Sequence, residues 1–271
     1  MNFFTVSLFL FMYTLIFVKK TDMTKKILTL AISLLMGFTL LAQNNNGAED
    51  GEKLKIYNGG ETYPVKTFKQ KFKSRKPKNI IFFIGDGMGV SQVYAALTAN
   101  RGELFIKNLK HIGFSKTYSA SNYITDSAAG GTALSSGIKT YNGAIGIDPD
   151  KNPVKTILEE AEEKGLATGL VSTSAITHAT PASFIAHQPS RNMYEEIAAD
   201  FLKTDIDVFI GGGYKHFTER KDGRNLANEL TGKGYIVEKD INKIKQIKNG
   251  KLAGLVAGEH PGRLDERKDY L

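Results

Sequence analysis

Apolar runs alternate with amphipathic stretches from residue 78 to the end of the chain. Short runs rich in branched and aromatic residues predict strands at 80–84, 167–171, 208–210, 235–237 and 252–256. Stretches with helical spacing predict helices beginning near Ser91 and covering 154–164, 194–202 and 225–231. The run at 80–84 is apolar throughout, which is typical of a parallel strand buried on both faces. The alternation predicts an α/β fold, doubly wound, with a mostly parallel sheet flanked by helices.

The N-terminal residues follow a different pattern. Residues 3–18 are apolar, and Met23 then opens a second unit with a basic start, an apolar run and a small residue before Gln43. We expect residues 23–42 to be a signal peptide, residues 1–22 an over-extended start and residues 43–77 a polar lead-in. Each apolar run is shorter than the roughly 20 residues that span a bilayer. An N-terminal membrane anchor is the alternative.

Composition narrows the choice of class. The chain has 271 residues, of which 41% are hydrophobic, so it can bury one sizeable core. It has no cysteine, which excludes disulfides and lipid acylation of cysteine and is compatible with export. The net charge is +8, or +5 without residues 1–42, and the basic residues gather at 66–78 and 243–251. Aromatic residues do not interleave with these basic runs in the pattern typical of nucleic-acid binding.

The stretch from Asp126 to Gly131 pairs a hydroxyl with a carboxylate and continues with small residues only. Ser127 can therefore stand at the start of a helix with an accessible Oγ, where backbone N–H groups favour an anion such as phosphate. The stretch lacks the Gly-x-Ser-x-Gly pattern of many serine hydrolases, because Thr125 stands two positions before Ser127. The serine needs activation from another source.

A second motif, Gly85-Asp86-Gly87-Met-Gly89, follows the predicted strand at 80–84. Ligand sites in α/β sheets collect at the carboxyl ends of strands. A carboxylate framed by glycines suits a cation. A dinucleotide-binding loop is disfavoured, since Val90 replaces the third glycine and Asp86 would repel a pyrophosphate. Metal ligation and a purely structural turn both stay open.

A third cluster follows the predicted strand at 167–171. His178 and Thr180 are two residues apart, and Pro181 favours an extended Thr180, so their side chains should lie on the same side. Arg191 offers a planar fork suited to phosphate. His187 fits a hydrogen-bonded structural histidine better than a ligand.

Together these motifs resemble the alkaline phosphatase family. The matching pieces are Ile-Gly-Asp86-Gly-Met-Gly, Thr-Asp126-Ser127-Ala-Ala, His178-Ala-Thr180-Pro and Ser190-Arg191, in the family's order. The resemblance implies phosphate monoester hydrolysis through a phosphoserine at Ser127. It also implies that Arg191 clamps phosphate oxygens and that Asp126 orients Arg191.

The resemblance further implies two zinc ions and one magnesium ion. Asp86 would bridge a zinc ion and the magnesium ion, and Thr180 would be a magnesium ligand. His178 occupies a position where family members carry aspartate or histidine, and we expect it to influence the magnesium site without binding the metal directly.

The family's remaining metal ligands lie in its C-terminal half: a glutamate, an aspartate and a histidine four apart, an Asp-His pair and a final histidine. None of the chain's histidines stands in such an arrangement; they are His111, His178, His187, His216 and His260. A zinc site needs three or four ligands. We therefore expect residues 78–271 to be a partial alkaline phosphatase catalytic domain, inactive by itself.

The expected ligands are phosphate monoesters and inorganic phosphate, with no nucleic acid and membrane contact only through the N-terminal signal segment. The expected location is outside the cytoplasm, periplasmic or extracellular, and a homodimer is left open. Two alternatives remain. One is another metal-dependent phosphoesterase or phosphomutase of the same superfamily, and the other is a secreted phosphate-binding protein without activity.

Overall fold

The computed structural model of the chain describes residues 62–68 and 77–263. The expected over-extended start and signal peptide, and most of the expected lead-in, lie outside these residues. Among the described residues, no helix combines the length and the hydropathy needed to cross a membrane.

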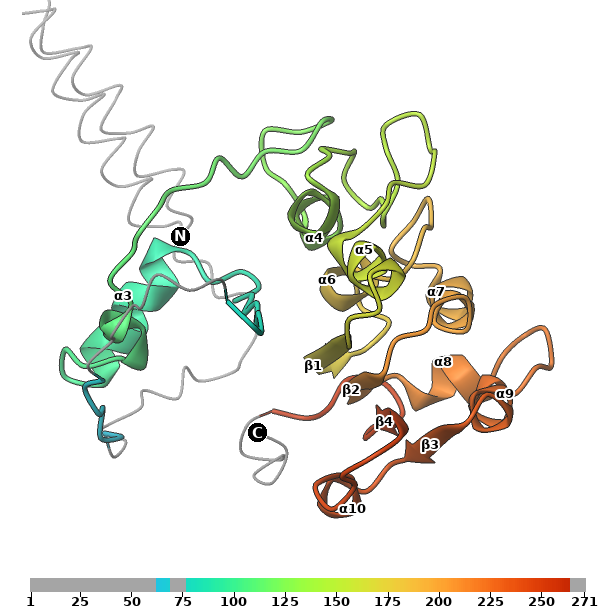
Figure 1. The fold of residues 1–271 in the computed structure, drawn as a ribbon. Helices are drawn as coiled ribbons and strands as arrows, with labels where there is room; N and C mark the ends of the chain where they lie inside the picture. The colour runs from blue at the N-terminus through green and yellow to red at the C-terminus, as the bar shows by residue number, and fades with distance from the viewer. Residues whose placement is uncertain (1–61, 69–76, 264–271) are drawn as a thin grey trace, which may run out of the picture. The chain divides into compact units, whose positions relative to one another are not determined.

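Four strands form a parallel sheet in the order β1-β2-β4-β3 (Figure 1). They are β1 (Gly169–Ala175), β2 (Val208–Gly212), β3 (Tyr235–Glu238) and β4 (Lys251–Leu255). The register pairs Val171 with Ile210 and Ile210 with Gly254. Strand β4 lies between β2 and β3 and is the most buried, as expected for its apolar run. The predicted α/β fold with a parallel sheet is confirmed.

Helices separate the strands along the chain. They are α3 (Val90–Ala99), α4 (Ser127–Ser136), α5 (Ile157–Glu163), α6 (Ala179–Ala182), α7 (Tyr194–Asp200), α8 (Tyr214–Thr218), α9 (Leu226–Gly232), α10 (Ile241–Ile244) and a 3₁₀ turn at Phe105–Asn108. Helix α5 begins later than predicted because Thr156 caps it, in a reciprocal capping box with Glu159. Figure 1 shows α7, α8 and α9 together on one side of the sheet.

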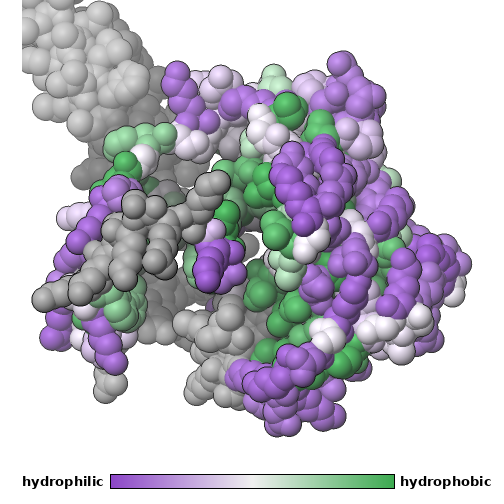
Figure 2. Space-filling view, viewed as in Figure 1, coloured by the Kyte–Doolittle hydropathy of each residue, from purple (hydrophilic) through white to green (hydrophobic). Residues whose placement is uncertain are grey.

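Three phenylalanines, one at the C-terminal end of α7, one in β2 and one in α8, form the centre of the core. The ring centroids of Phe201 and Phe209 are 4.8 Å apart, and Phe217 lies 5.9 Å from Phe201. All three side chains are fully buried. Figure 2 shows a mostly hydrophilic surface over the outer side of α7 to α9, which fits helices that bury one apolar face against the sheet.

The predicted strand at 80–84 is wrong. These residues have no regular secondary structure, and Ile80 and Phe83 are 85% and 86% exposed. A parallel strand needs hydrogen-bonded neighbours, and no described strand pairs with this segment. Strand β1, whose single described ladder partner is β2, also exposes Val171. The apolar run is therefore present, but none of the described strands forms a hydrogen-bonded ladder with it.

The strand predicted at 167–171 is displaced toward the C-terminus. Thr168 N–H donates to the Asp207 carboxylate instead of entering the ladder, which starts at Gly169 opposite Val208. The strand then continues through the small polar residues 172–174 to Ala175. Its carboxyl end thus comes directly before the segment that carries His178 and Thr180.

Candidate active site

Ser127 is the first residue of α4, as the sequence predicted. Asp126 caps this helix: its Oδ1 accepts a hydrogen bond from Ala129 N–H at 2.9 Å. Ser127 is half-buried, and among the described residues its Oγ has no hydrogen-bond partner. The small residues Ala128 and Ala129 are buried beneath it. The hydroxyl therefore lies at a helix N-terminus, where the helix backbone sets its position.

Arg191 lies beside this helix start. Its Nη1 donates to Asp126 Oδ2 at 3.0 Å, and both side chains are about a quarter exposed. Because Oδ1 of the same carboxylate caps α4, Asp126 ties the guanidinium to the helix that carries Ser127. The carboxylate accepts bonds at both oxygens. This geometry suits the orienting role that the family resemblance implies for Asp126, which stays a prediction.

His178 contacts the other side of the guanidinium. Its Nε2 lies 3.1 Å from Arg191 Nη2. Arginine can only donate, so Nε2 accepts and the ring is neutral with its proton on Nδ1. Burial, the Arg191 charge and His260 lower the pKa of His178, against the opposing effect of Asp86. Among the described residues, contacts engage two of the five guanidinium N–H groups and leave three available for a ligand.

Asp86 and Thr180, the two predicted metal ligands, lie together. Thr180 Oγ1 donates to Asp86 Oδ2 at 2.7 Å, although the residues are 94 apart in sequence. Gly87 adopts a left-handed φ of 66°, and the glycine-framed sequence forms a turn that presents the exposed Asp86. The metal-binding role of both residues stays a prediction.

The expected extended geometry of 178–180 is wrong. Thr180 lies inside the short helix α6, and His178 is its N-cap residue. Proline is tolerated in the first turn of a helix, where its missing N–H is not needed, and Pro181 stands in that turn. His178 and Thr180 consequently face different partners, Arg191 and Asp86.

His187 has the structural surroundings expected of it. Its Nε2 lies 2.9 Å from Glu159 Oε1, and its Nδ1 lies 2.5 Å from the carbonyl oxygen of Gly146. Both ring nitrogens are therefore engaged, one with Glu159 in the first turn of α5 and one with the loop after α4.

Sequence reasoning missed His260 and the pair Asn142 and Gly143. His260 Nδ1 accepts from Ala175 N–H at 3.1 Å, and its ring centroid lies 5.3 Å from that of His178. No sequence signal predicts this contact across 85 residues. Asn-Gly is a turn signal that could have located the loop at 142–143, but not its contacts with Asp126.

The donor set fits magnesium in kind and does not fit zinc. Carboxylate and hydroxyl oxygens are ligands that magnesium accepts, often with water completing its shell. Within residues 62–68 and 77–263, no group of three or more His, Cys, Asp or Glu side chains could hold a metal ion. Structural and catalytic zinc sites use at least three protein ligands. Asp86 and Thr180 could hold magnesium, whereas the described residues do not form a zinc site.

The four-stranded parallel sheet makes this an α/β protein, in which Asp126 links a serine at a helix start to an arginine. The alkaline phosphatase family profile matches residues 77–268, which covers all of these motifs, and the chain belongs to this family.

The relatives extend this result. The chain is 39% identical over 260 residues to alkaline phosphatase 3 of Bacillus subtilis, which is 90% of this chain and 53% of that protein. It is 37% identical to alkaline phosphatase of Escherichia coli, over 70% of this chain and 49% of that protein. The structure of alkaline phosphatase from the Antarctic bacterium TAB5 matches with a TM-score of 0.64 and 40% identity, covering 68% and 54% of the two chains. A variant of that enzyme has Mg bound in its M3 site.

The chain spans about half the length of these relatives. What the complete relatives do is therefore carried to this chain only as a proposal.

Proposed function

We propose that this chain carries the nucleophile and the phosphate-binding arginine of an alkaline phosphatase that hydrolyses phosphate monoesters. The observation that carries the proposal is the contact of Arg191 with Asp126, the residue that caps the helix beginning at Ser127. This contact brings a hydroxyl, a fixed cation and free helix N–H groups to one place, which suits a phosphate group.

The residues suggest the following course. Arg191 and the α4 N-terminus bind the equatorial oxygens of the phosphoryl group, whose charge grows in the transition state. Ser127 Oγ attacks phosphorus; the new O–P bond forms, the bond to the leaving group breaks, and the alcohol departs with a proton. Water then cleaves the phosphoserine and releases inorganic phosphate. Magnesium held by Asp86 and Thr180 would supply further positive charge for the phosphate oxygens.

A second candidate is a phosphate-binding protein without turnover. The observation that favours it is the lack of a cluster of metal-ligating side chains among the described residues. On the first proposal, the described residues support a single phosphoryl transfer to Ser127, whereas repeated zinc-dependent turnover requires ligands other than these residues. No observation favours a phosphodiesterase or a phosphomutase over these two candidates.

Covalent labelling separates the candidates. The chain is incubated with a phosphate monoester, zinc and magnesium, and its intact mass is measured for the wild type and for Ser127→Ala. The enzyme proposal expects one phosphoryl group on the wild type and none on Ser127→Ala, and labelling retained in the variant would refute it. A wild type that binds inorganic phosphate but takes up no label identifies the second candidate.

We also propose export of the protein, based on the pattern at residues 23–42. N-terminal sequencing of the mature protein should begin at Gln43. Residues 3–18 in the mature protein would contradict this.

A further inference from the structure

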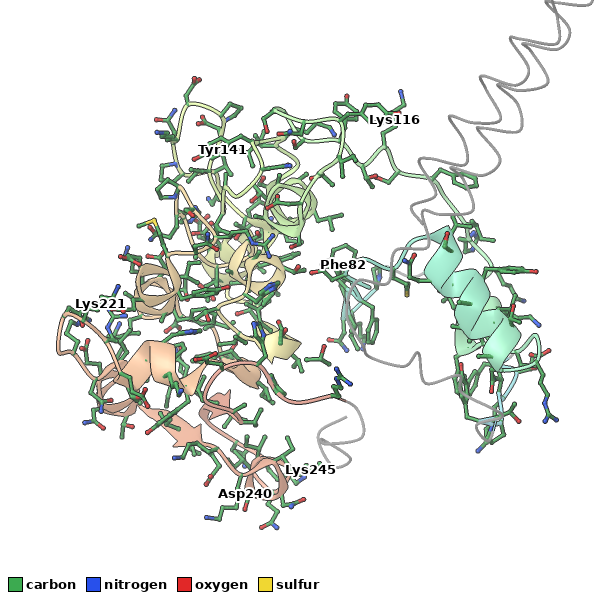
Figure 3. The ribbon with its side chains drawn as sticks, turned by 180° about the vertical axis from the view of Figure 1, so that it is seen from behind. Phe82, Lys116, Tyr141, Lys221, Asp240 and Lys245 are labelled. Atoms are coloured by element: carbon green, nitrogen blue, oxygen red, sulfur yellow. The ribbon has the colours of Figure 1, made fainter. Side chains whose placement is uncertain are left out.

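The loop that follows α4 contacts both the nucleophile's helix and the segment of Arg191. It carries Tyr141, labelled in Figure 3, whose hydroxyl donates to the carbonyl oxygen of Pro189 at 3.0 Å. Further along, the backbones of Ile145 and Gln188 exchange two hydrogen bonds of 2.9 Å each. The loop is thus attached along its length to residues 187–191.

Asn142 fixes the chain just before the nucleophile. Its Oδ1 accepts from Asp126 N–H at 3.2 Å, and its Nδ2 donates to the carbonyl oxygen of Ile124 at 3.0 Å. One amide side chain therefore satisfies a donor and an acceptor on either side of Thr125. This sets the direction in which the chain enters α4 at Ser127.

Gly143 fixes the arginine. Its N–H donates to Asp126 Oδ2 at 3.0 Å, the same oxygen that accepts from Arg191 Nη1. Its carbonyl oxygen accepts from Arg191 N–H at 2.7 Å. The φ of Gly143 is 93°, and a Cβ there would meet no atom within 4 Å, so the backbone conformation and not the space requires glycine.

We propose that Asn142 and Gly143 are positioning residues, which set the place of Arg191 relative to Ser127 through the backbone and carboxylate of Asp126. The inference rests on the proposed function, because positioning has a purpose only if the two side chains act on one phosphate. Neither residue has to touch the ligand. The loop contacts the chain before α4 through Asn142 and the backbone of Arg191 through Gly143.

The alternative is that the loop only stabilises the fold. The two roles differ in coupling. A residue that acts through Arg191 loses its effect when Arg191 is removed, whereas a merely structural residue has the same effect in both backgrounds.

A double-mutant cycle on phosphate affinity makes this test. Inorganic phosphate is titrated into the full chain, with wild type, Asn142→Ala, Arg191→Ala and the double variant compared. We expect Asn142→Ala to weaken binding by about tenfold or more, since small misplacements of a binding group cost up to about a hundredfold. In the Arg191→Ala background the same substitution should have little effect. Equal loss in both backgrounds would overturn the proposal.

The matched control is Asn152→Ala. Asn152 also hydrogen-bonds an aspartate, Asp148, through Nδ2 at 3.1 Å, but its bonds do not reach Asp126 or Arg191. It should leave phosphate affinity unchanged. If Asn142→Ala fails to fold, Asn142→Asp replaces it in the cycle, since it keeps the acceptor for Asp126 N–H and loses the donor to Ile124.

A second readout is independent of phosphate. In the free protein, the guanidinium N–H signals of Arg191 and the amide of Gly143 should exchange slowly with solvent, and Asn142→Ala should accelerate both. If the wild type binds no phosphate, the proposed function fails and this exchange measurement alone decides the positioning role. Unchanged exchange at both groups would refute it.

Discussion

Replacing Asp126 by asparagine tests how the site is held together. Asp126 Oδ1 caps α4 through Ala129 N–H, and Oδ2 accepts from Gly143 N–H and Arg191 Nη1 at 3.0 Å each. Asparagine is as good a helix cap as aspartate, so one bond survives with Oδ1 in place. The side-chain NH₂ then faces two donors, and the arginine loses its counter-charge.

The expected loss of stability follows from the two hydrogen bonds to Asp126 Oδ2 that asparagine cannot accept in the same way, those from Gly143 N–H and Arg191 Nη1. A hydrogen bond to a charged group contributes about 1.5–3 kcal/mol net. Since both side chains of the ion pair are about a quarter exposed, solvent screening reduces this sum. We expect Asp126→Asn to lower the free energy of unfolding by about 2–4 kcal/mol.

Urea unfolding followed by far-UV circular dichroism measures the change. The control is Asp240→Asn at the start of α10; this aspartate is labelled in Figure 3 and also caps a helix, because it accepts from Asn242 N–H at 2.8 Å. Asp240 forms no ion pair with an arginine within the part of the chain that the structure describes. The control should lie within about 0.5 kcal/mol of the wild type. Equal stability of the two variants would refute the claim that Asp126 ties Arg191 to α4.

Two further predictions concern the surrounding framework. Gly146→Ala should lower the free energy of unfolding by about 3 kcal/mol or more, because its Cβ would lie 2.1 Å from the carbonyl oxygen of Ala186 at a φ of +56°. The control Gly137→Ala has a φ of +76° but open space around the new Cβ, and it should cost only about 1–2 kcal/mol. Equal losses of stability in thermal unfolding would show that the close approach at Gly146 is unimportant. Burial of Glu159 acts to raise the pKa of its carboxyl, but bonds from Thr156 and His187 outweigh it and hold this pKa below the ordinary value of 4.5. The ionised Glu159 therefore stabilises the folded state above about pH 4.5, and this stabilisation is lost as the pH falls through the lowered pKa. In Glu159→Gln, the free energy of unfolding should consequently fall less steeply at acid pH than in the wild type. If the variant loses as much stability at acid pH as the wild type, the loss comes from other carboxyl groups.

The sequence predicts the elements whose patterns are local. The apolar runs of β2, β3 and β4 and the helices α7 and α9 lie within one or two residues of their predicted bounds. The start of α4 at Ser127 also follows from a local rule, because Asp126 is a favoured cap. Such features depend on neighbours a few residues away.

Features that depend on distant partners were not predictable from pattern alone. The run at 80–84 has the composition of a strand but no ladder partner among the described residues, so hydrophobicity alone gave the wrong structure. Thr180 lies in the helix Ala179–Ala182 although Pro181 favours an extended predecessor, because a proline in the first helical turn has no lost bond to replace. The contact between Gly143 and Asp126 depends on a backbone N–H, which carries no sequence signature.

Above all, we propose that Arg191, held beside Ser127, binds the phosphate group. Titration of inorganic phosphate into the wild-type chain and Arg191→Ala, followed by calorimetry, tests it most directly. We predict binding by the wild type and a loss of about tenfold or more in the variant, since each charged hydrogen bond lost is equivalent to about that factor. The same affinity in both proteins would contradict the account.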